Sequence, residues 1–235
     1  MRDNVYKTKS ATKFTKQTKN GTRSARGSNG MKFFIGKKVG MTQVFTDDGR
    51  CMPATVVAAP KIAVTQVRTS EKDGYSAIQV AGGTRKAKNV SKAVRGHFAG
   101  KNYEFAREFR LKDAKVSESF TVGTEIGVDI FAPGDTVQVT GISKGKGFQS
   151  VIKRHGFHGG PRSHGQKHSE RAPGSIGGGL RNRVPKGMRM AGRTGGDKVT
   201  VKGLKVLAVD ANKGEIIISG AVPGRRGTLI ALRSA

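Results

Sequence analysis

His155, His158, His164 and His168 are four of the five histidines of the chain, and they raise the question of a zinc site. Structural zinc sites generally include cysteine, whereas the single cysteine, Cys51, lies far away in sequence, and no H-E-x-x-H motif is present. Each histidine stands among Arg, Lys and Gly, where an imidazole more naturally stacks on a base or contacts a phosphate. The sequence therefore predicts no metal site and no cofactor.

The run at residues 141–145, GISKG, matches the G-x-S-x-G pattern of a hydrolase nucleophile elbow. That mechanism needs an acid and then a histidine, but no acid lies between Ser143 and the last histidine, His168. The run also resembles a P-loop, yet its spacing is one residue short and Gly147 stands where Ser or Thr must bind magnesium. Cys51 falls in a predicted strand, where a thiol is generally a small buried hydrophobic group. We therefore expect no enzyme and no small-molecule substrate.

The segment of residues 144–197 has the most unusual composition in the chain. It holds fourteen glycines, twelve Lys or Arg and only two acids, Glu170 and Asp197. Apart from Phe148–Arg154, which could form a short helix, it has no secondary-structure pattern, and so long a loop is normally functional or disordered. Glycine lets the backbone approach a crowded surface, while Arg side chains and backbone N–H groups contact phosphates without sequence readout. The segment is predicted to order against a rigid polyanion; a solvated flexible loop would gain nothing from its self-repelling charge.

The charge of the whole chain indicates the same kind of partner. There are 44 Lys and Arg against 16 Asp and Glu, a formal net charge of +28. Nothing indicates a membrane, because no apolar run approaches the roughly 18 residues that a spanning helix needs. One cysteine excludes a disulfide framework. Trp is absent and aromatic residues are 6% of the chain, so we expect recognition of RNA phosphates rather than extensive base stacking.

The remaining residues predict a mainly β protein. Val-, Ile- and Thr-rich runs with turn residues between them predict strands. They lie at residues 32–39, 41–45, 51–59, 62–68, 75–81, 103–111, 125–131, 136–142, 198–209, 214–219 and 228–232. Residues 84–101 are basic and weakly helical, so 84–123 is predicted to be an insertion. We expect one β-domain over 31–143 and 198–235, interrupted by the loop at 144–197.

Residues 1–30 form a basic tail without hydrophobic periodicity, which predicts disorder until a partner binds. Two interpretations stay open. The tail could be an RNA-binding extension, or it could be an organelle transit peptide, because such peptides are also poor in acids and rich in Ser and Arg.

Five motifs resemble the large ribosomal subunit protein 3 family in its bacterial form. In order along the chain they are FIGKKVGMTQVF at 34–45, TGISKGKGF at 140–148, RAPGSIG at 171–177, KGMRMAG at 186–192 and GAVPG at 220–224. The resemblance implies a six-stranded Greek-key β-barrel of the translation-protein type with an α/β insertion and a long extended basic loop.

In that family the loop threads through large-subunit rRNA with two arms and ends near the peptidyl transferase centre. The family also nucleates early subunit assembly and contacts neighbouring ribosomal proteins. Carried over to this chain, the arms are roughly 144–175 and 183–197. The tip comprises Gly177, Gly178, Gly179, Leu180, Arg181 and Asn182. The tip is slightly shorter than in other members and lacks the Gln that some bacterial members methylate, so no such modification is expected.

We expect the basic residues of the first two motifs and of the loop to bind rRNA. They are Lys37, Lys38, Lys144, Lys146, Lys153, Arg154, His155, Arg162, His164, Lys167, His168, Arg171, Arg183, Lys186, Arg189 and Arg193. The expected location is a bacterial cytoplasmic ribosome, or an organellar one if residues 1–30 are a transit peptide. The first rival hypothesis is a free RNA- or DNA-binding factor, such as a chaperone or nucleoid protein, but the sequence contains no RRM, KH or helix-turn-helix motif. The second is an enzyme, but the sequence lacks a complete set of catalytic residues.

Overall fold

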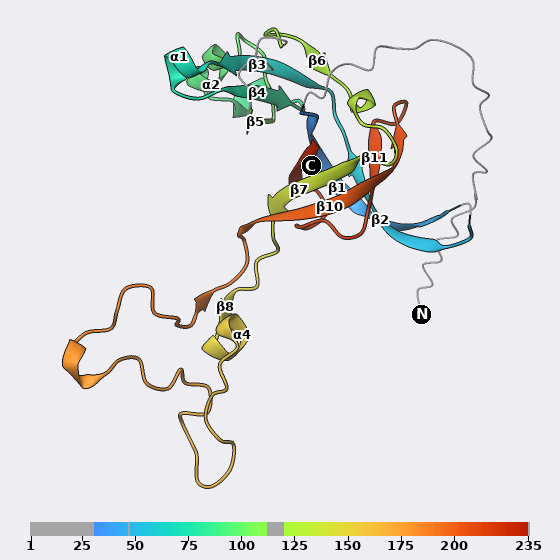
Figure 1. The fold of residues 1–235 in the computed structure, drawn as a ribbon. Helices are drawn as coiled ribbons and strands as arrows, with labels where there is room; N and C mark the ends of the chain where they lie inside the picture. Colours follow the sequence, from blue (N-terminus) through green and yellow to red (C-terminus); the bar gives the residue numbers. More distant parts are fainter. Residues whose placement is uncertain (1–30, 47, 112–119, 235) are drawn as a thin grey trace. The chain divides into compact units, whose positions relative to one another are not determined.

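The computed structural model describes residues 31–234 except 47 and 112–119 (Figure 1). The predicted basic tail at 1–30 lies outside the described residues. So do Asp47 and residues 112–119 of the predicted insertion.

Six antiparallel strands close into a barrel in the order β1-β12-β7-β10-β11-β2. The six strands are β1 (Phe33–Phe45), β2 (Cys51–Ala58), β7 (Thr136–Ile142), β10 (Lys198–Asp210), β11 (Glu215–Ser219) and β12 (Leu229–Ser234). The two runs predicted at 32–39 and 41–45 form one strand, β1, because a bulge between Lys38 and Gly40 absorbs the interruption. The mainly β class and the six-stranded closed barrel are confirmed.

The barrel interior is filled by alternate residues of its strands, as the two-residue period of a strand requires. Val137 and Val139 of β7, Ile216 and Ile218 of β11, and Leu232 of β12 are all buried. Gly36 of β1 is needed for a close approach, because a Cβ at that position would lie 2.8 Å from the carbonyl oxygen of Ala58.

A second, four-stranded sheet has the order β5-β4-β3-β6. Its strands are β3 (Ile62–Arg68), β4 (Ala77–Gly82), β5 (Phe105–Arg110) and β6 (Glu125–Ile126). Among the described residues of this part of the chain, the helices are α1 (Ser70–Asp73), η1 (Ala87–Asn89), α2 (Lys92–His97) and η2 (Val128–Ile130). The strand predicted at 125–131 is wrong beyond β6, where the chain turns into η2. The Phe33 and Phe109 rings stack 4.8 Å apart and join β1 to β5.

Tight turns join β1 to β2 and β10 to β11. Gly49, between β1 and β2, adopts φ 76°, which glycine tolerates and other residues resist. Asp210 accepts hydrogen bonds from the backbone of Asn212 and Lys213 between β10 and β11. The expectation of a buried Cys51 is wrong, because its thiol is exposed. Strand β11 pairs only with Ala54–Ala58 of β2, so Cys51 lies beyond the closed part of the barrel.

Between β7 and β10 the chain forms β8 (Phe148–Gln149), α4 (Val151–His155), η3 (Gly179–Arg181) and β9 (Gly192–Arg193), which can be followed in Figure 1. The helix predicted over Phe148–Arg154 is therefore shorter, since its first residues pair with β9 instead. No helix in the described ranges is both long enough and apolar enough to cross a membrane.

Candidate nucleic-acid interface

The basic segment at residues 144–197, called the arm from here on, begins and ends side by side. Lys198 at the start of β10 pairs with Ile142 at the end of β7. The N–H of Ser143 donates to the carbonyl of Asp197 at 2.9 Å, and the Ser143 hydroxyl accepts from the N–H of Asp197 at 3.3 Å. Ser143, the central residue of the GISKG run, thus closes the base of the arm, as a residue at a strand end does.

The outgoing and returning segments of the arm stay paired beyond this base. The N–H of Lys146 donates to Thr194 at 2.8 Å, and the N–H of Thr194 donates to Gly147 at 3.0 Å. Strand β8 then pairs with β9. A Cβ on Gly195 would overlap the carbonyl oxygen of Lys144, and its φ of 79° also favours glycine. The paired segments, residues 143–155 and 190–197, are called the neck.

Residues of helix α4 form hydrogen bonds to the returning segment of the neck. The Arg154 guanidinium donates from Nη1 to the carbonyl of Met190 at 2.9 Å, and Nε2 of His155 lies 3.1 Å from the same oxygen. A carbonyl only accepts, so this contact requires a proton on Nε2. Gly192 leaves room for the guanidinium, because a Cβ there would lie 2.5 Å from Nη1. Two predicted RNA-binding residues therefore also shape the neck.

Residues 156–174 form a first loop that closes on itself. The N–H of Gly160 donates to the carbonyl of Glu170 at 2.8 Å, and a Cβ on Gly159 would lie 2.5 Å from that same oxygen. The Arg162 guanidinium lies 2.8 Å from the Glu170 carboxylate. Because the Arg162 side chain is 84% exposed, this ion pair is screened by water and can exchange its partner at little cost. The outer part of the predicted first arm therefore forms a loop that is closed by these contacts.

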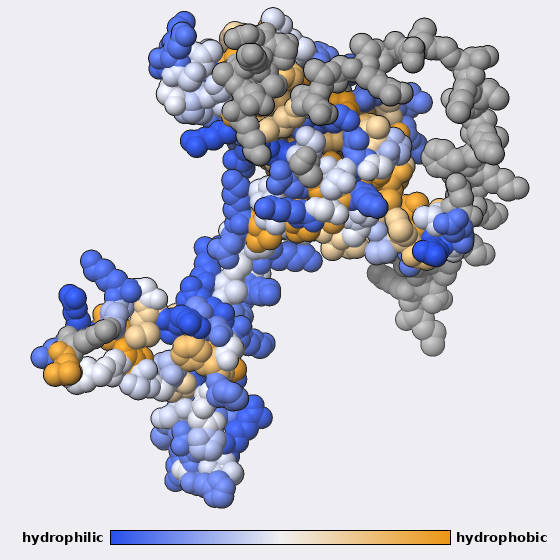
Figure 2. Space-filling model, viewed as in Figure 1, coloured by the Kyte–Doolittle hydropathy of each residue, from blue (hydrophilic) through white to orange (hydrophobic). Residues whose placement is uncertain are grey.

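Residues 175–189 form a second loop with a different surface. It contains the predicted tip and η3, followed by Asn182 in the left-handed conformation with φ 43°. Leu180 is fully exposed, and Ile176, Val184 and Met188 are exposed as well. Figure 2 shows hydrophobic residues at the outer end of this loop. Apolar groups held in water are stabilised when a partner covers them.

Nearly all predicted RNA-binding side chains of the arm are exposed. They are Lys144, Lys146, Lys153, Arg154, Arg162, His164, Lys167, His168, Arg171, Arg183, Lys186, Arg189 and Arg193, whereas His155 is half-buried. Of the two acids in the arm, Glu170 is paired with Arg162. The positive charge of the arm is therefore presented to solvent with little internal compensation.

Lys37 and Lys38 differ from the arm residues, because their ammonium groups have partners in the protein. Lys37 lies 2.6 Å from the Glu104 carboxylate. Lys38 donates to the carbonyls of Val222 at 2.7 Å and Gly224 at 3.2 Å, which ties β1 to the turn before β12. Burial, and then repulsion from Lys144, lower the pKa of Lys38. Sequence spacing could not reveal these long-range partners, and a phosphate contact by either lysine stays a prediction.

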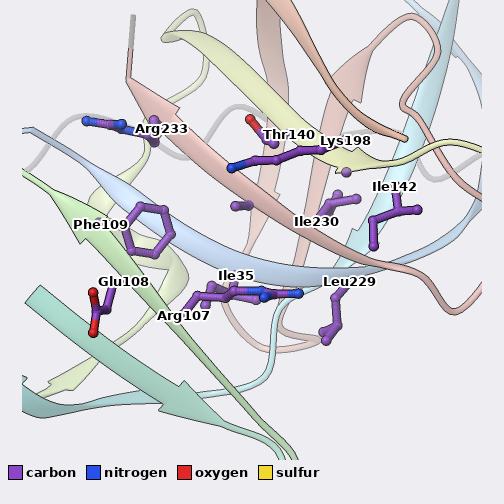
Figure 3. A pocket seen from close by; sticks show the side chains of 12 residues that line it. Ile35, Arg107, Glu108, Phe109, Thr140, Ile142, Lys198, Leu229, Ile230 and Arg233 are labelled. Carbon is purple, nitrogen blue, oxygen red and sulfur yellow. The ribbon is translucent and has the colours of Figure 1, made fainter. Parts of the chain in front are cut away.

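A cavity of about 290 Å³ lies between β5 and the barrel strands β7, β10 and β12 (Figure 3). Ile230 and Phe109 contribute apolar side chains, and Arg107, Lys198 and Arg233 contribute positive charge. Its lining contains no His, Cys or Ser. Within the described ranges, no three His, Cys, Asp or Glu side chains gather closely enough to hold a metal ion.

These features define a class: a small barrel protein whose longest excursion presents a dense, exposed positive charge. Comparison with known proteins then gives the family. The family model described as Ribosomal protein L3 matches residues 78–219. The chain therefore belongs to the Ribosomal protein L3 family, in its bacterial form, as the resemblance predicted.

Curated relatives extend the similarity along most of the chain. Large ribosomal subunit protein uL3 of Herpetosiphon aurantiacus is 46% identical over 86% of this chain and 95% of its own length. The protein of the same name from Pelotomaculum thermopropionicum is 47% identical over 87% of this chain and 97% of its own length. The protein of the same name from Cutibacterium acnes is 48% identical over 87% of this chain and 92% of its own length.

Proposed function

We propose that the chain is a structural constituent of the large ribosomal subunit and that its arm binds large-subunit rRNA directly. The names of the relatives support the first part. The exposed cations of the arm, with one of its two acids already paired, carry the second part. Such a surface gains free energy when RNA phosphates replace condensed counterions.

In this proposal the barrel, with a Greek-key connection of its strands, is the scaffold over 31–143 and 198–235. The α/β insertion at about 84–123 supplies η1, α2 and β5, and β5 completes the sheet whose other strands, β3, β4 and β6, lie outside these bounds. Residues 1–30 add a basic extension, and the arm is the extended element that threads through rRNA. The neck supports this role, because backbone hydrogen bonds such as Ser143 to Asp197 set the direction in which the arm leaves the barrel.

The second loop is proposed to reach toward the peptidyl transferase centre with residues 177–182 at its tip. Leu180 and its apolar neighbours suit a partner with flat apolar faces, which nucleobases provide. The protein would act without catalysis of its own and would also contact neighbouring ribosomal proteins in a bacterial cytoplasmic ribosome. Binding early through the barrel and arm together, it would nucleate assembly of the subunit.

The experiment measures binding of the full chain to protein-free large-subunit rRNA over a range of salt concentrations. The variant combines Arg162→Gln, Lys167→Gln and Arg171→Gln. Each lost phosphate contact reduces the slope of log K against log salt by roughly 0.7 to 0.9, so three lost contacts reduce it by about 2 to 3. A matched control combines Lys61→Gln, Lys72→Gln and Lys213→Gln, which removes the same charge from exposed sites outside the arm.

An unchanged slope in the arm variant would show that these residues do not contact phosphates. Sedimentation of cell extracts at moderate salt separates the ribosomal role from that of a free nucleic-acid-binding factor. The proposed protein migrates with large subunits, whereas a free factor migrates as a small species.

A further inference from the structure

A second cluster of uncompensated positive charge lies far from the arm in sequence, on the four-stranded sheet and its helices. Residues 74–103 contain six Lys or Arg and no acid. All six side chains are exposed, and we call them the insertion patch: Arg85, Lys86, Lys88, Lys92, Arg95 and Lys101. Lys88 lies in η1, Lys92 and Arg95 lie in α2, and the other three lie in the adjoining loops.

The segment that carries the patch is held against the sheet by several contacts. Ser91 caps α2 by accepting from the N–H of Val94 at 3.4 Å. At the other end of the helix, Nε2 of His97 lies 2.9 Å from the side-chain oxygen of Gln79 on β4. The same Gln79 oxygen accepts from the hydroxyl of Thr65 on β3 at 2.8 Å. The position of α2 is thus set by the sheet below it.

Further contacts close the segment on itself. The Arg95 guanidinium donates to the carbonyl of Ala87 at 3.0 Å and joins α2 to η1. The N–H of Arg85 donates to the carbonyl of Asn102 at 3.0 Å, which brings the two ends of the segment together. The patch is therefore an ordered surface before any partner binds, and ordering it costs little free energy at the moment of binding.

The acids nearest in sequence and on the neighbouring strand are engaged with other cations. Glu104 is paired with Lys37, Asp73 with Arg68, and Glu108 with Arg68. None of the ion pairs found among the described residues includes a member of the insertion patch. Among the described residues, these six like charges therefore have no acidic partner.

The chemistry of the patch favours phosphates over a protein partner. The fully buried centre of a protein interface is apolar, and Val94 is the one large hydrophobic side chain that residues 85–101 expose, at 43%. We propose that the insertion patch is a second rRNA-binding surface, which takes the phosphate backbone of RNA separately from the arm. This inference rests on the proposed function in one respect, that the partner is large-subunit rRNA.

Two separate surfaces on one chain bind one RNA as a bivalent ligand. Once either surface is bound, the other meets its RNA site at a high effective concentration, so the loss of either one weakens binding by a large factor. The test uses the full chain with Lys86→Gln, Lys88→Gln and Lys92→Gln. Gln keeps the helix propensity of Lys and removes its charge. Arg95 is left unchanged because it holds η1.

Binding to protein-free large-subunit rRNA is measured against salt for this patch variant, for the arm variant and for the control at Lys61, Lys72 and Lys213. The slope of log K against log salt should fall by about 2 to 3 in the patch variant. It should stay unchanged in the control. A patch variant that behaves like the control overturns the inference, while the arm variant reports separately on the proposed function. Equal thermal unfolding of all three proteins confirms that each is folded.

A second measurement identifies the partner in the particle itself. Lysine acetylation is compared between the free protein and intact large subunits at Lys86, Lys88 and Lys92. We expect protection in the subunit that is lost after nuclease digestion. Reaction at the same rate in both states overturns the inference. Protection that survives nuclease assigns the patch to an acidic protein and equally overturns it.

Discussion

The barrel and the arm differ in the interactions that keep them ordered. The barrel buries alternate apolar residues of six strands, such as Val139, Ile218 and Leu232. Among the described residues of the arm, Val151 is the one buried side chain, and backbone hydrogen bonds hold the neck. Hydrophobic burial stabilises the barrel without a partner. The loops of the arm have few apolar contacts of their own, so we expect their order to depend on a partner.

Removing the loops tests directly whether the barrel is stable without them. Deleting residues 158–190 and joining the ends with a short Gly linker should leave the barrel folded, because loop-closure cost grows slowly with length. Incorporation into early assembly particles should survive in part, whereas mature subunits should stall in assembly or lose peptide-bond formation. Thermal unfolding of the variant and gradient profiles of cells carrying it measure the two effects. Unfolding of the barrel would show that the loops belong to its core.

A matched pair of truncations contrasts the two regions directly. Ile218→Ala removes a fully buried side chain of β11 and should destabilise the protein by about 2 to 5 kcal/mol. Leu180→Ala removes a fully exposed side chain of the second loop and should leave stability within about 0.5 kcal/mol. Chemical denaturation gives both values. A large loss of stability in Leu180→Ala would mean that the second loop packs on the protein.

The neck is the boundary between the regions, and Gly195→Ala tests it. The added Cβ overlaps the carbonyl oxygen of Lys144, and the alanine must also adopt φ 79°. The resulting local strain is on the order of 1 to 3 kcal/mol. The neck should open while the barrel keeps its unfolding temperature, and rRNA binding should weaken. Amide exchange at Lys146 and Thr194 measures the opening. Gly145→Ala, where the added Cβ meets open space, is the control.

The smallest expected effect concerns an ion pair of the barrel. Burial acts to raise the pKa of Asp135, but the Ala132 N–H and the Lys32 ammonium, 2.6 Å away, lower it below its usual value. The resulting stabilisation is present above the unfolded pKa, near 3.8, and is lost as pH falls through the lower folded pKa. Asp135→Asn should cost about 1 kcal/mol or less at neutral pH. The difference from the unchanged protein should vanish in strong acid, and a constant difference would contradict the assignment.

Local chemistry made much of the barrel predictable. The strands at 62–68 and 136–142 were predicted with their observed bounds, because Val- and Ile-rich runs end at turn residues. The exposed Cys51 was not predictable in the same way. A strand pattern indicates that a residue is in a strand, whereas its burial depends on how far the neighbouring strand β11 extends.

The arm shows the same division. Its charge and glycine content were evident from composition, and most of its predicted RNA-binding side chains are exposed. The closure of the first loop by Glu170, the β8–β9 pair and the hold of Arg154 on Met190 were missed. These contacts join residues far apart in the chain, and short polar segments have no hydrophobic periodicity from which such contacts could be predicted.

The sequence by itself determined where the chain can bury apolar surface and where it cannot, because alternation, turn residues and charge are local properties. It therefore determined that a β-domain is interrupted by a cationic segment, and its motifs indicated the family. The tertiary structure alone decided which cations remain free. Lys37 faces Glu104 and Lys38 faces two carbonyls, while the insertion patch finds no acid among the described residues. Compensation of charge acts through space at a few ångströms, and only the folded chain brings those partners together.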